Sequence, residues 1–466
     1  MTPLRSLFAS LALLATSAGC GPSEPVSPDT PRDQGHLDPL LSEQIAQAVA
    51  DILSDHCFQE QPDKSHCDWG TFPLETSQQF EMSQNTGEAI LIVDEFPSLP
   101  PRAIRYRNRL KGFFRVDGAG EIGPVQFSWR APTTLFNVLT RFASPEFIPA
   151  ETLRPLSAPI QTVYGFYDDE NIGHGSLVFS LLVEANPHQP IVLMDSLSFH
   201  RFAPEEFCDP SGSPESIARL STKAQRVASG LRRIIGEQSI RFVNLSSGNT
   251  LETLKQDWNA RCGGPRPSDD ILRAKLNTYA PIVDVLFNTP GVFTAHAAIN
   301  ASNGRDFPFD FPSPAYPNRL LTGYFTALES GLDATGQGNH ASLQGWPSPA
   351  SVDVYMNSGV LPQRPFPYNR TPWLQVDGFG VDIYPVSSTT TSWMAPLTLS
   401  RFIHARYSHF PDCELSNGLI ASLRDVLVPS SCPAQPGSLC AYQDPLKHGQ
   451  IEAVRLGYRP REYVEP

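Results

Sequence analysis

From residue 88 onward, short apolar runs alternate with longer amphipathic stretches, and this alternation constrains the fold more than any other feature of the chain. Four runs rich in β-branched and apolar residues predict strands, and three stretches with apolar residues at helical spacing predict helices. The predicted strands are 89–93, 191–194, 240–245 and 292–298, and the predicted helices are 174–185, 214–235 and 269–287. Such alternation is typical of an α/β fold, in which helices cover both faces of a mostly parallel sheet.

The ends of these elements also carry signals. Ser213 followed by Pro214 predicts the beginning of the second helix, and Gly236 predicts its end. In a parallel sheet, the chemistry lies at the carboxyl ends of the strands. Asp94 and Asn300 each follow a predicted strand, so we expect both at this edge of the sheet.

The amino terminus has the pattern of an export signal. Its apolar run, residues 7–18, is too short for a transmembrane helix. The run ends in Ser17-Ala18-Gly19-Cys20, which resembles a bacterial lipobox, in which the cysteine becomes the lipidated first residue. In bacterial lipoproteins, an aspartate directly after the lipidated cysteine keeps the protein from the outer membrane. Gly21 occupies that position here, and by the same resemblance it suggests sorting to the outer membrane. We expect a signal peptide at 1–19 and a lipid anchor in the bacterial cell envelope at Cys20; the alternative is an ordinary signal and a secreted protein.

Composition limits the domain organisation and the partners. A chain of 466 residues with 40% hydrophobic residues can form a substantial core in one large domain or in two or three small ones. The formal charge of -13 argues against a nucleic-acid partner, because phosphate contacts require clustered Lys and Arg. Pro-rich and Ser-rich residues 20–37 predict a tether, and 38–87 predict an extension with one amphipathic helix and a disulfide. The remainder, 88–466, is the predicted main domain.

Cysteine usage agrees with an oxidising compartment. The chain has eight cysteines, of which seven follow Cys20. Local sequence favours two disulfides and a third bridge within the carboxy-terminal trio, which leaves one cysteine over. The favoured pairs are Cys57 with Cys67 and Cys208 with Cys262, and the trio is Cys413, Cys432 and Cys440. No pair has the spacing of zinc ligands with histidines nearby, so we predict no metal site.

Three short motifs supply an acid, an imidazole and a hydroxyl, in that order along the chain. They are Ile90-Leu91-Ile92-Val93-Asp94, Gly173-His174-Gly175 and Thr390-Thr391-Ser392-Trp393-Met394-Ala395-Pro396. A serine is a poor nucleophile until a neighbouring base takes its proton and a carboxylate orients that base. The motifs therefore favour a serine hydrolase.

Over roughly residues 88–458, these motifs and the segments between them resemble the subtilases, the subtilisin-like serine proteases. The order Asp, His, Ser is that of subtilisin. Residues 243–248 resemble the strand and loop that line the substrate cleft in that family, and 297–300 resemble the segment whose asparagine donates to the oxyanion. Residues 448–453 resemble the turn and helix that close the domain.

The resemblance implies a role for each site residue. Asp94 would orient His174, His174 would accept the proton of Ser392, and Ser392 would attack the scissile carbonyl. Asn300 and the backbone N–H of Ser392 would stabilise the oxyanion. The residues expected to line the substrate cleft are Ser246, Ser247 and Gly248. The mechanism requires no cofactor; the family often binds calcium, but no acidic loop here is typical of a calcium site.

The sequence departs from the family pattern at several positions. Thr390 and Ile299 stand where glycines are usual, and each places a side chain beside the path of the substrate. Pro396 should lie in the first turn of the helix after Ser392, where a missing N–H costs little.

Three other aspartates leave the identity of the acid open: Asp117, Asp168 and Asp169.

Residues 96–167 form a long insertion between Asp94 and His174, which we expect to cover or shape the cleft. Within it, the stretch 118–123 fits the letters of the dinucleotide fingerprint, Gly-x-Gly-x-x-Gly. A strand-like sequence follows it instead of a helix, so we predict a hairpin turn.

These observations predict a lipid-anchored serine endopeptidase that hydrolyses peptide bonds through an acyl-enzyme, with a protein or peptide as substrate. The alternative is a catalytically inactive protein of the same fold that binds peptides in its cleft. A third interpretation, an esterase-like hydrolase, would retain the same nucleophile.

Overall fold

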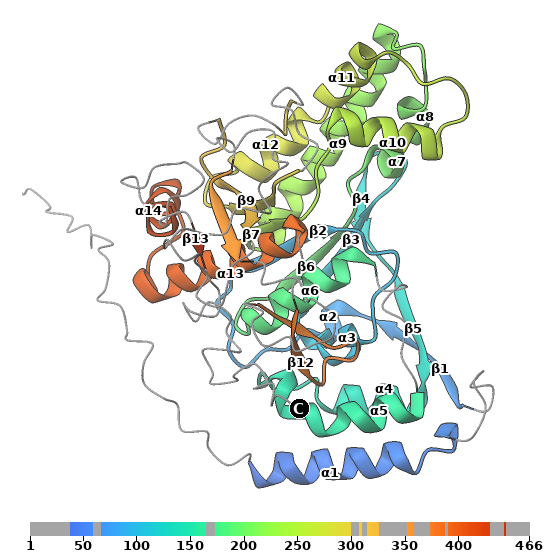
Figure 1. The fold of residues 1–466 in the computed structure, drawn as a ribbon, viewed down its shortest axis with the longest axis vertical. Coiled ribbons are helices and arrows are strands. Elements are labelled where there is room, and N and C mark those ends of the chain that lie inside the picture. Colours follow the sequence, from blue (N-terminus) through green and yellow to red (C-terminus); the bar gives the residue numbers. More distant parts are fainter. Residues whose placement is uncertain are drawn as a thin grey trace, which may run out of the picture.

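A nine-stranded, mostly parallel sheet forms the centre of the protein in the computed structural model (Figure 1). The strand order is β13-β10-β9-β8-β7-β2-β6-β3-β4, and within it only the β3–β4 pair is antiparallel. The strands are β2 Ala89–Asp94, β3 Leu110–Val116, β4 Ile122–Pro124, β6 Ile191–Asp195, β7 Ile240–Leu245, β8 Phe293–Ala297, β9 Arg319–Phe325, β10 Val354–Asn357 and β13 Tyr442–Gln443. The structure describes residues 38–58, 67–164, 173–299, 307–309, 315–325, 352–357, 373–386, 390–428 and 442–443.

Helices pack on both faces of this sheet. On one face lie α6 (His174–Ala185) and α13 (Thr391–His409), and on the other lie α9 (Pro214–Glu237) and α12 (Ala280–Asn288). Side chains of β2 alternate between the two cores: Ile90 and Ile92 join the first, and Leu91 and Val93 join the second. Because both faces are buried, the strand is apolar at every position rather than at alternate ones. The predicted α/β class with a mostly parallel sheet is confirmed.

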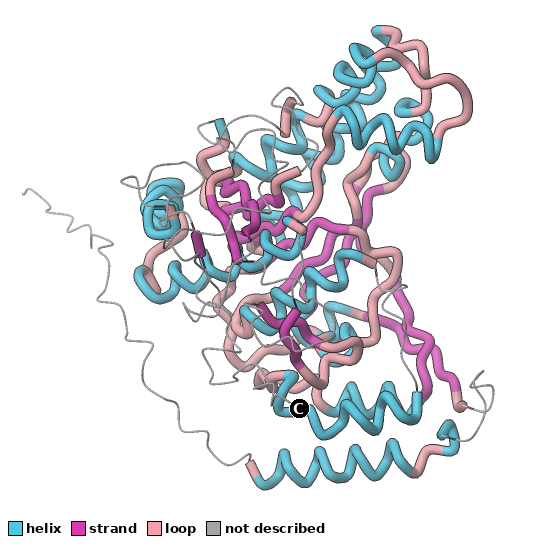
Figure 2. Tube along the Cα trace, in the orientation of Figure 1, coloured by secondary structure: helices cyan, strands magenta, loops and turns pink. Residues whose placement is uncertain are grey.

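The amino-terminal extension packs against the insertion that follows Asp94. Strand β1 (Trp69–Leu74) pairs with β5 (Phe127–Pro132) in a separate antiparallel ribbon. Helix α1 (Pro39–Leu53) packs on α4 (Thr133–Arg141) and α5 (Ser157–Tyr164), and this group lies at the bottom of the view in Figures 1 and 2. The insertion also adds β3 and β4 to the main sheet, so its described part extends the core.

The predicted hairpin turn is present between β3 and β4. Asp117 Oδ1 accepts hydrogen bonds from the backbone N–H groups of Ala119 and Glu121, both at 2.9 Å. Gly120 has a φ of 84°, which a glycine adopts without strain. The glycine-rich letters at 118–123 therefore form a turn between antiparallel strands.

Two predicted helix boundaries differ from the structure. The stretch 269–287 contains two helices, α11 (Asp269–Asn277) and α12, because Pro281 lacks the N–H that would continue the hydrogen-bond ladder. Gly236 lies inside α9, and Ser239 beyond its end takes the left-handed conformation, with a φ of 56°. The predicted beginning of α9 is confirmed, since the Ser213 hydroxyl accepts from the N–H of Ser216.

The remaining elements are short or peripheral. They are α2 Thr76–Gln79, α3 Arg102–Arg105, α7 Phe199–Phe202, α8 Pro204–Phe207, α10 Leu251–Arg261, α14 Asn417–Leu427, the antiparallel pair β11 Trp373–Val376 and β12 Ile383–Val386, and the 3-10 helices η1 His56–Phe58, η2 Arg107–Arg109 and η3 Ala150–Leu156.

Two predicted disulfides are confirmed. Cys57 bonds to Cys67, with Cα atoms 4.5 Å apart, and Cys208 bonds to Cys262, with Cα atoms 5.2 Å apart. Cys413 is also disulfide-bonded, while Cys432 and Cys440 lie outside the described residues.

The predicted signal peptide, Cys20 and the tether, residues 1–37, lie outside the described residues as well. None of the helices in the described ranges combines the length and the apolar composition needed to cross a bilayer.

Candidate active site

Asp94 and His174 meet at the carboxyl edge of the sheet. Asp94 is the last residue of β2, and His174 is the first residue of α6. His174 Nδ1 lies 2.7 Å from Asp94 Oδ1, within hydrogen-bond distance. Asp94 is only 3% exposed, whereas the His174 side chain is 34% exposed, so the imidazole is accessible and its partner is not.

The two glycines beside His174 make this contact sterically feasible. Gly173 has a φ of 28°, and a Cβ there would lie 2.6 Å from Pro97 Cδ. A Cβ on Gly175 would lie 2.7 Å from the Glu95 carbonyl oxygen and 2.9 Å from Asp94 Cβ. The Gly175 N–H donates to that same Glu95 carbonyl at 3.1 Å. Helix α6 therefore approaches the end of β2 more closely than any larger residue would allow.

The environment of His174 favours its protonated form. Burial opposes this by lowering the pKa of the imidazole, but the hydrogen bond and negative charge of Asp94, together with the charge of Glu95, outweigh burial. The pKa of His174 is consequently raised above its ordinary value. A base with a raised pKa holds a transferred proton more firmly.

A second buried aspartate, Asp195, fixes the chain after Asp94. It ends β6 and stands opposite Asp94 in the register of the two strands. Its Oδ1 accepts from the N–H of Phe96 at 3.0 Å, and its Oδ2 accepts from Arg115 Nε at 2.7 Å. Sequence reasoning missed this residue, although the matching Asp at the end of a second apolar strand was a visible signal.

Ser392 is the second residue of α13, so it lies at the amino end of a helix that packs on α6. Its hydroxyl donates to the Ser246 carbonyl at 3.4 Å, and its N–H donates to the Thr390 hydroxyl at 3.4 Å. Among the described residues, no hydrogen bond joins Ser392 to His174. Thr390 therefore caps the N–H that the family resemblance assigns to the oxyanion.

Trp393 connects the serine segment with the histidine. Its ring stacks on the His174 imidazole, with ring centroids 4.6 Å apart and an angle of 28° between the planes. Because Trp393 is the next residue after Ser392, this contact places the hydroxyl-bearing residue in the neighbourhood of the base. Sequence reasoning gave Trp393 no role, since nothing local distinguishes it from a core aromatic residue.

Pro396 lies farther into α13 than predicted. The helix begins at Thr391, which puts Pro396 in its second turn and leaves the Ser392 carbonyl without its usual N–H partner. The Ser246 hydroxyl donates to that carbonyl at 2.8 Å, and Asn244 Nδ2 donates to the Ser246 hydroxyl at 2.8 Å. Ser246 thus ties the end of β7 to the helix that carries Ser392.

A cavity of about 180 Å³ lies at the carboxyl ends of β2, β6 and β7. Ser247 and Gly248, predicted to line the substrate cleft, belong to its wall. His296 Nε2 lies 3.0 Å from the Ser247 carbonyl and holds this loop against β8. Glu95 and Asp257 bring carboxylates to the same wall. Burial, followed by the charge of Glu95, raises the pKa of Asp257 despite the opposing charge of Arg261.

The other predicted site residues are placed only in part. Of the alternative acids, Asp117 forms the β3–β4 turn, whereas Asp168 and Asp169 lie outside the described residues. Asn300 also lies outside them, immediately after Ile299. Within the described ranges, no group of three or more His, Cys, Asp and Glu side chains is arranged to hold a metal ion.

No protein-family model matches the chain, and no curated protein matches its sequence. A buried carboxylate, an imidazole held through Nδ1 and a hydroxyl at a neighbouring helix terminus are the groups that acyl transfer uses.

Proposed function

We propose that the protein is a serine endopeptidase of the subtilisin-like type, with Asp94, His174 and Ser392 as its catalytic residues. The observation that carries the proposal is the 2.7 Å contact between Asp94 and His174 at the carboxyl edge of a parallel sheet. This contact leaves Nε2 of the imidazole as the free basic atom. The helix that carries Ser392 begins beside the same imidazole.

The reaction would begin with rotation of the Ser392 hydroxyl away from the Ser246 carbonyl. His174 Nε2 takes the hydroxyl proton while Oγ bonds to the scissile carbonyl carbon, and Asp94 stabilises the resulting imidazolium. The tetrahedral intermediate breaks its C–N bond, and His174 gives the proton to the leaving amine. A water molecule then hydrolyses the acyl-enzyme by the same steps and regenerates Ser392. Long catalytic hydrogen bonds that shorten when the substrate binds are common in free enzymes.

Stabilisation of the oxyanion falls to Asn300 and to the N–H of Ser392. The 3.4 Å bond from that N–H to the Thr390 hydroxyl is long for a hydrogen bond, so an oxyanion competes for it readily. In the proposed reaction, the Ser392 N–H therefore bonds to the Thr390 hydroxyl in the free protein and to the oxyanion when the substrate is bound.

The substrate would be an extended peptide that enters the cavity beside Ser247 and Gly248. Backbone hydrogen bonds to cleft edges tolerate many sequences, so preference would depend on the pockets for side chains. No cofactor takes part in this chemistry, and we assign no calcium site.

We propose that the protein works in the bacterial cell envelope, held at the outer membrane by a lipid on Cys20. The lipobox-like segment Ser17-Ala18-Gly19-Cys20 supports this. The disulfides agree with it, because such bonds persist in oxidising compartments outside the cytosol.

One observation favours the alternative, a catalytically inactive protein that binds peptides in the same cleft. Both the hydroxyl and the N–H of Ser392 have partners other than His174 or a substrate. A protein that retained the fold and lost the activity would show this arrangement permanently.

Labelling with a fluorophosphonate, which reacts only with an activated serine, tests the proposal. The wild-type protein should gain the mass of the probe on the peptide that contains Ser392. Ser392→Ala and His174→Ala should abolish labelling, whereas Ser229→Ala, an exposed serine on α9, should leave it unchanged. A folded wild-type protein that takes up no probe would contradict the proposed peptidase.

A further inference from the structure

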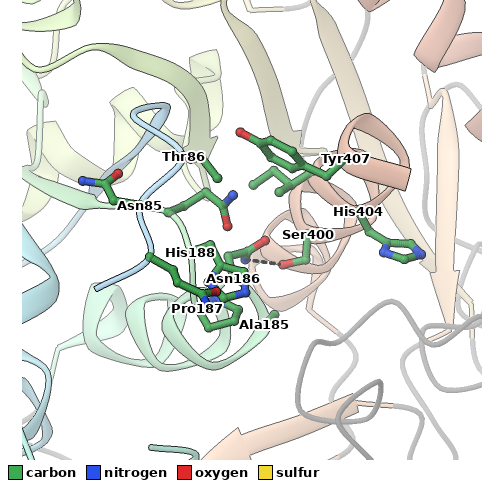
Figure 3. A pocket seen from close by; sticks show the side chains of 12 residues that line it. Asn85, Thr86, Ala185, Asn186, Pro187, His188, Ser400, His404 and Tyr407 are labelled. Atoms are coloured by element: carbon green, nitrogen blue, oxygen red, sulfur yellow. Dashed lines mark hydrogen bonds between the residues drawn. The ribbon is translucent and has the colours of Figure 1, made fainter. Parts of the chain in front are cut away.

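A second cavity lies at the opposite end of the sheet from the candidate active site, near the beginnings of β2 and β6 (Figure 3). It has a volume of about 320 Å³, within the range of small-molecule sites. Ala185, the last residue of α6, and Ser400 and Tyr407 of α13 contribute to its wall. Asn186 Nδ2 donates to Ser400 Oγ at 3.0 Å and joins the two helices there.

The wall of this cavity is mostly apolar and carries no full charge. Among the described residues that line it, none is Asp, Glu, Lys or Arg. Four carboxamides contribute instead: Gln84, Asn85, Asn186 and Gln189. Part of this hydrogen-bonding capacity is used inside the protein, since Asn186 Nδ2 donates to Leu182 and Ser400, and Asn85 Oδ1 accepts from the Gly87 N–H. The Asn186 carbonyl oxygen and the Asn85 amide nitrogen are the ends that suit a hydroxyl group. A charged ligand would lose its hydration here without meeting a counter-ion, and that loss is costly.

Glu88 follows the segment 84–86 that lines the cavity, and its carboxylate already has partners within the protein. It accepts a hydrogen bond from the Tyr407 hydroxyl, and it lies 3.5 Å from the guanidinium of Arg406. Its charge is therefore neutralised on the protein side and does not call for a cationic ligand.

Apolar surface lies next to the polar groups. Pro187 and Ile403 supply hydrocarbon, and the ring of Tyr407 adds an aromatic wall. His188 and His404 also contribute to the wall. The matching ligand has a C–H face for the hydrocarbon and a rim of hydroxyl groups for the amides and imidazoles.

We propose that this cavity binds a neutral carbohydrate of about monosaccharide size. None of its side chains belongs to the candidate active site, so the proposal stands whether or not the protein is a peptidase.

The loop from Gln84 to Thr86 offers a way to close the cavity without disturbing the core. All three residues are exposed, and the Thr86 N–H donates to the His188 carbonyl at 3.0 Å, which holds the loop over the cavity. Thr86→Phe keeps this backbone bond, removes the Thr86 hydroxyl that accepts from the Glu88 N–H at 3.3 Å, and places an aromatic ring at the entrance. Thr222→Phe on the exposed side of α9 is the matched control.

Saturation-transfer NMR on the full chain, near neutral pH, tests the proposal with four sugars of matched size. Glucose and N-acetylglucosamine are neutral, glucosamine is a cation and glucuronate is an anion. We expect binding of at least one neutral sugar, with both charged analogues weaker by about tenfold or more. Thr86→Phe should abolish the signal, and Thr222→Phe should retain it.

A second variant guards against a local rearrangement around Thr86. His404→Leu removes one polar partner from the opposite wall and should weaken binding while the thermal unfolding midpoint stays near that of the wild type. The proposal is wrong if neither neutral sugar binds, if a charged analogue binds equally well, or if both variants bind like the wild type.

Discussion

Replacing Gly175 with alanine should separate the catalytic acid from its base. The added Cβ would lie 2.7 Å from the Glu95 carbonyl oxygen, 2.8 Å from Phe96 Cζ and 2.9 Å from Asp94 Cβ. Restoring an ordinary carbon–carbon contact of about 3.5 Å to Asp94 requires a movement of about 0.6 Å. Added to the 2.7 Å separation of Asp94 and His174, that movement gives about 3.3 Å, beyond the usual hydrogen-bond range.

The expected result of Gly175→Ala is a loss of about 1–3 kcal/mol in the free energy of unfolding, typical of overpacking in a buried site. The rate of fluorophosphonate labelling should fall by about 100-fold, since displacements of this size have such effects on catalysis. Thermal unfolding and the labelling rate would measure these two consequences, and NMR titration of His174 would report the loss of its contact with Asp94.

Gly236→Ala is the matched control for this substitution. A Cβ on Gly236 meets no atom within 4 Å, and the residue lies inside α9. Alanine should therefore leave labelling unchanged and raise the free energy of unfolding by up to about 1 kcal/mol. If Gly175→Ala labels and unfolds like the wild type, the close approach of α6 to β2 does not hold the acid and base together.

Three further substitutions test the charge on His174, the support of the α13 helix and the lipid anchor. Asp94→Asn removes the charge that raises the pKa of His174, so the acid limb of the labelling profile should move to lower pH while the maximal rate falls about 10⁴-fold. In the wild type, protonated His174 stabilises the fold below about pH 6.5, because its pKa is higher in the folded than in the unfolded protein. This contribution to the free energy of unfolding should disappear as the pH rises through the folded-state pKa, and thermal unfolding measured against pH would show the loss. Ser246→Ala should lower the free energy of unfolding by about 1–3 kcal/mol, because the Ser392 carbonyl loses its donor. The loss should be smaller in a Pro396→Ala background, where the N–H of residue 396 can reach that carbonyl, and a double-mutant cycle would measure the difference. Cys20→Ser should move the protein from the membrane fraction to the soluble fraction after cell fractionation, and unchanged membrane association would contradict the lipid anchor.

The sequence was sufficient to predict the elements whose signals are local. Helix α6 and strand β7 have the predicted bounds, because apolar periodicity and flanking turn residues define them. Pro281 is also a local signal for the break between α11 and α12. The prediction of a single helix over 269–287 gave more weight to the apolar pattern that runs through the whole stretch.

The supporting contacts of the site could not be predicted, because they join segments far apart in the chain. Asp195 reaches the N–H of Phe96, and Ser246 replaces the helical donor that Pro396 lacks. Neither contact follows from spacing along the sequence. The stacking of Trp393 on His174 depends on how α13 packs against α6, which no local pattern encodes.

The most direct test of the proposed peptidase is whether the purified protein cuts an unfolded polypeptide through Ser392. Incubation with reduced, carboxymethylated casein, followed by mass spectrometry, would detect each new amino terminus. We expect fragments with the wild-type protein and intact substrate with Ser392→Ala. Intact casein after incubation with a folded wild-type protein that binds it would contradict the peptidase and leave a peptide-binding protein.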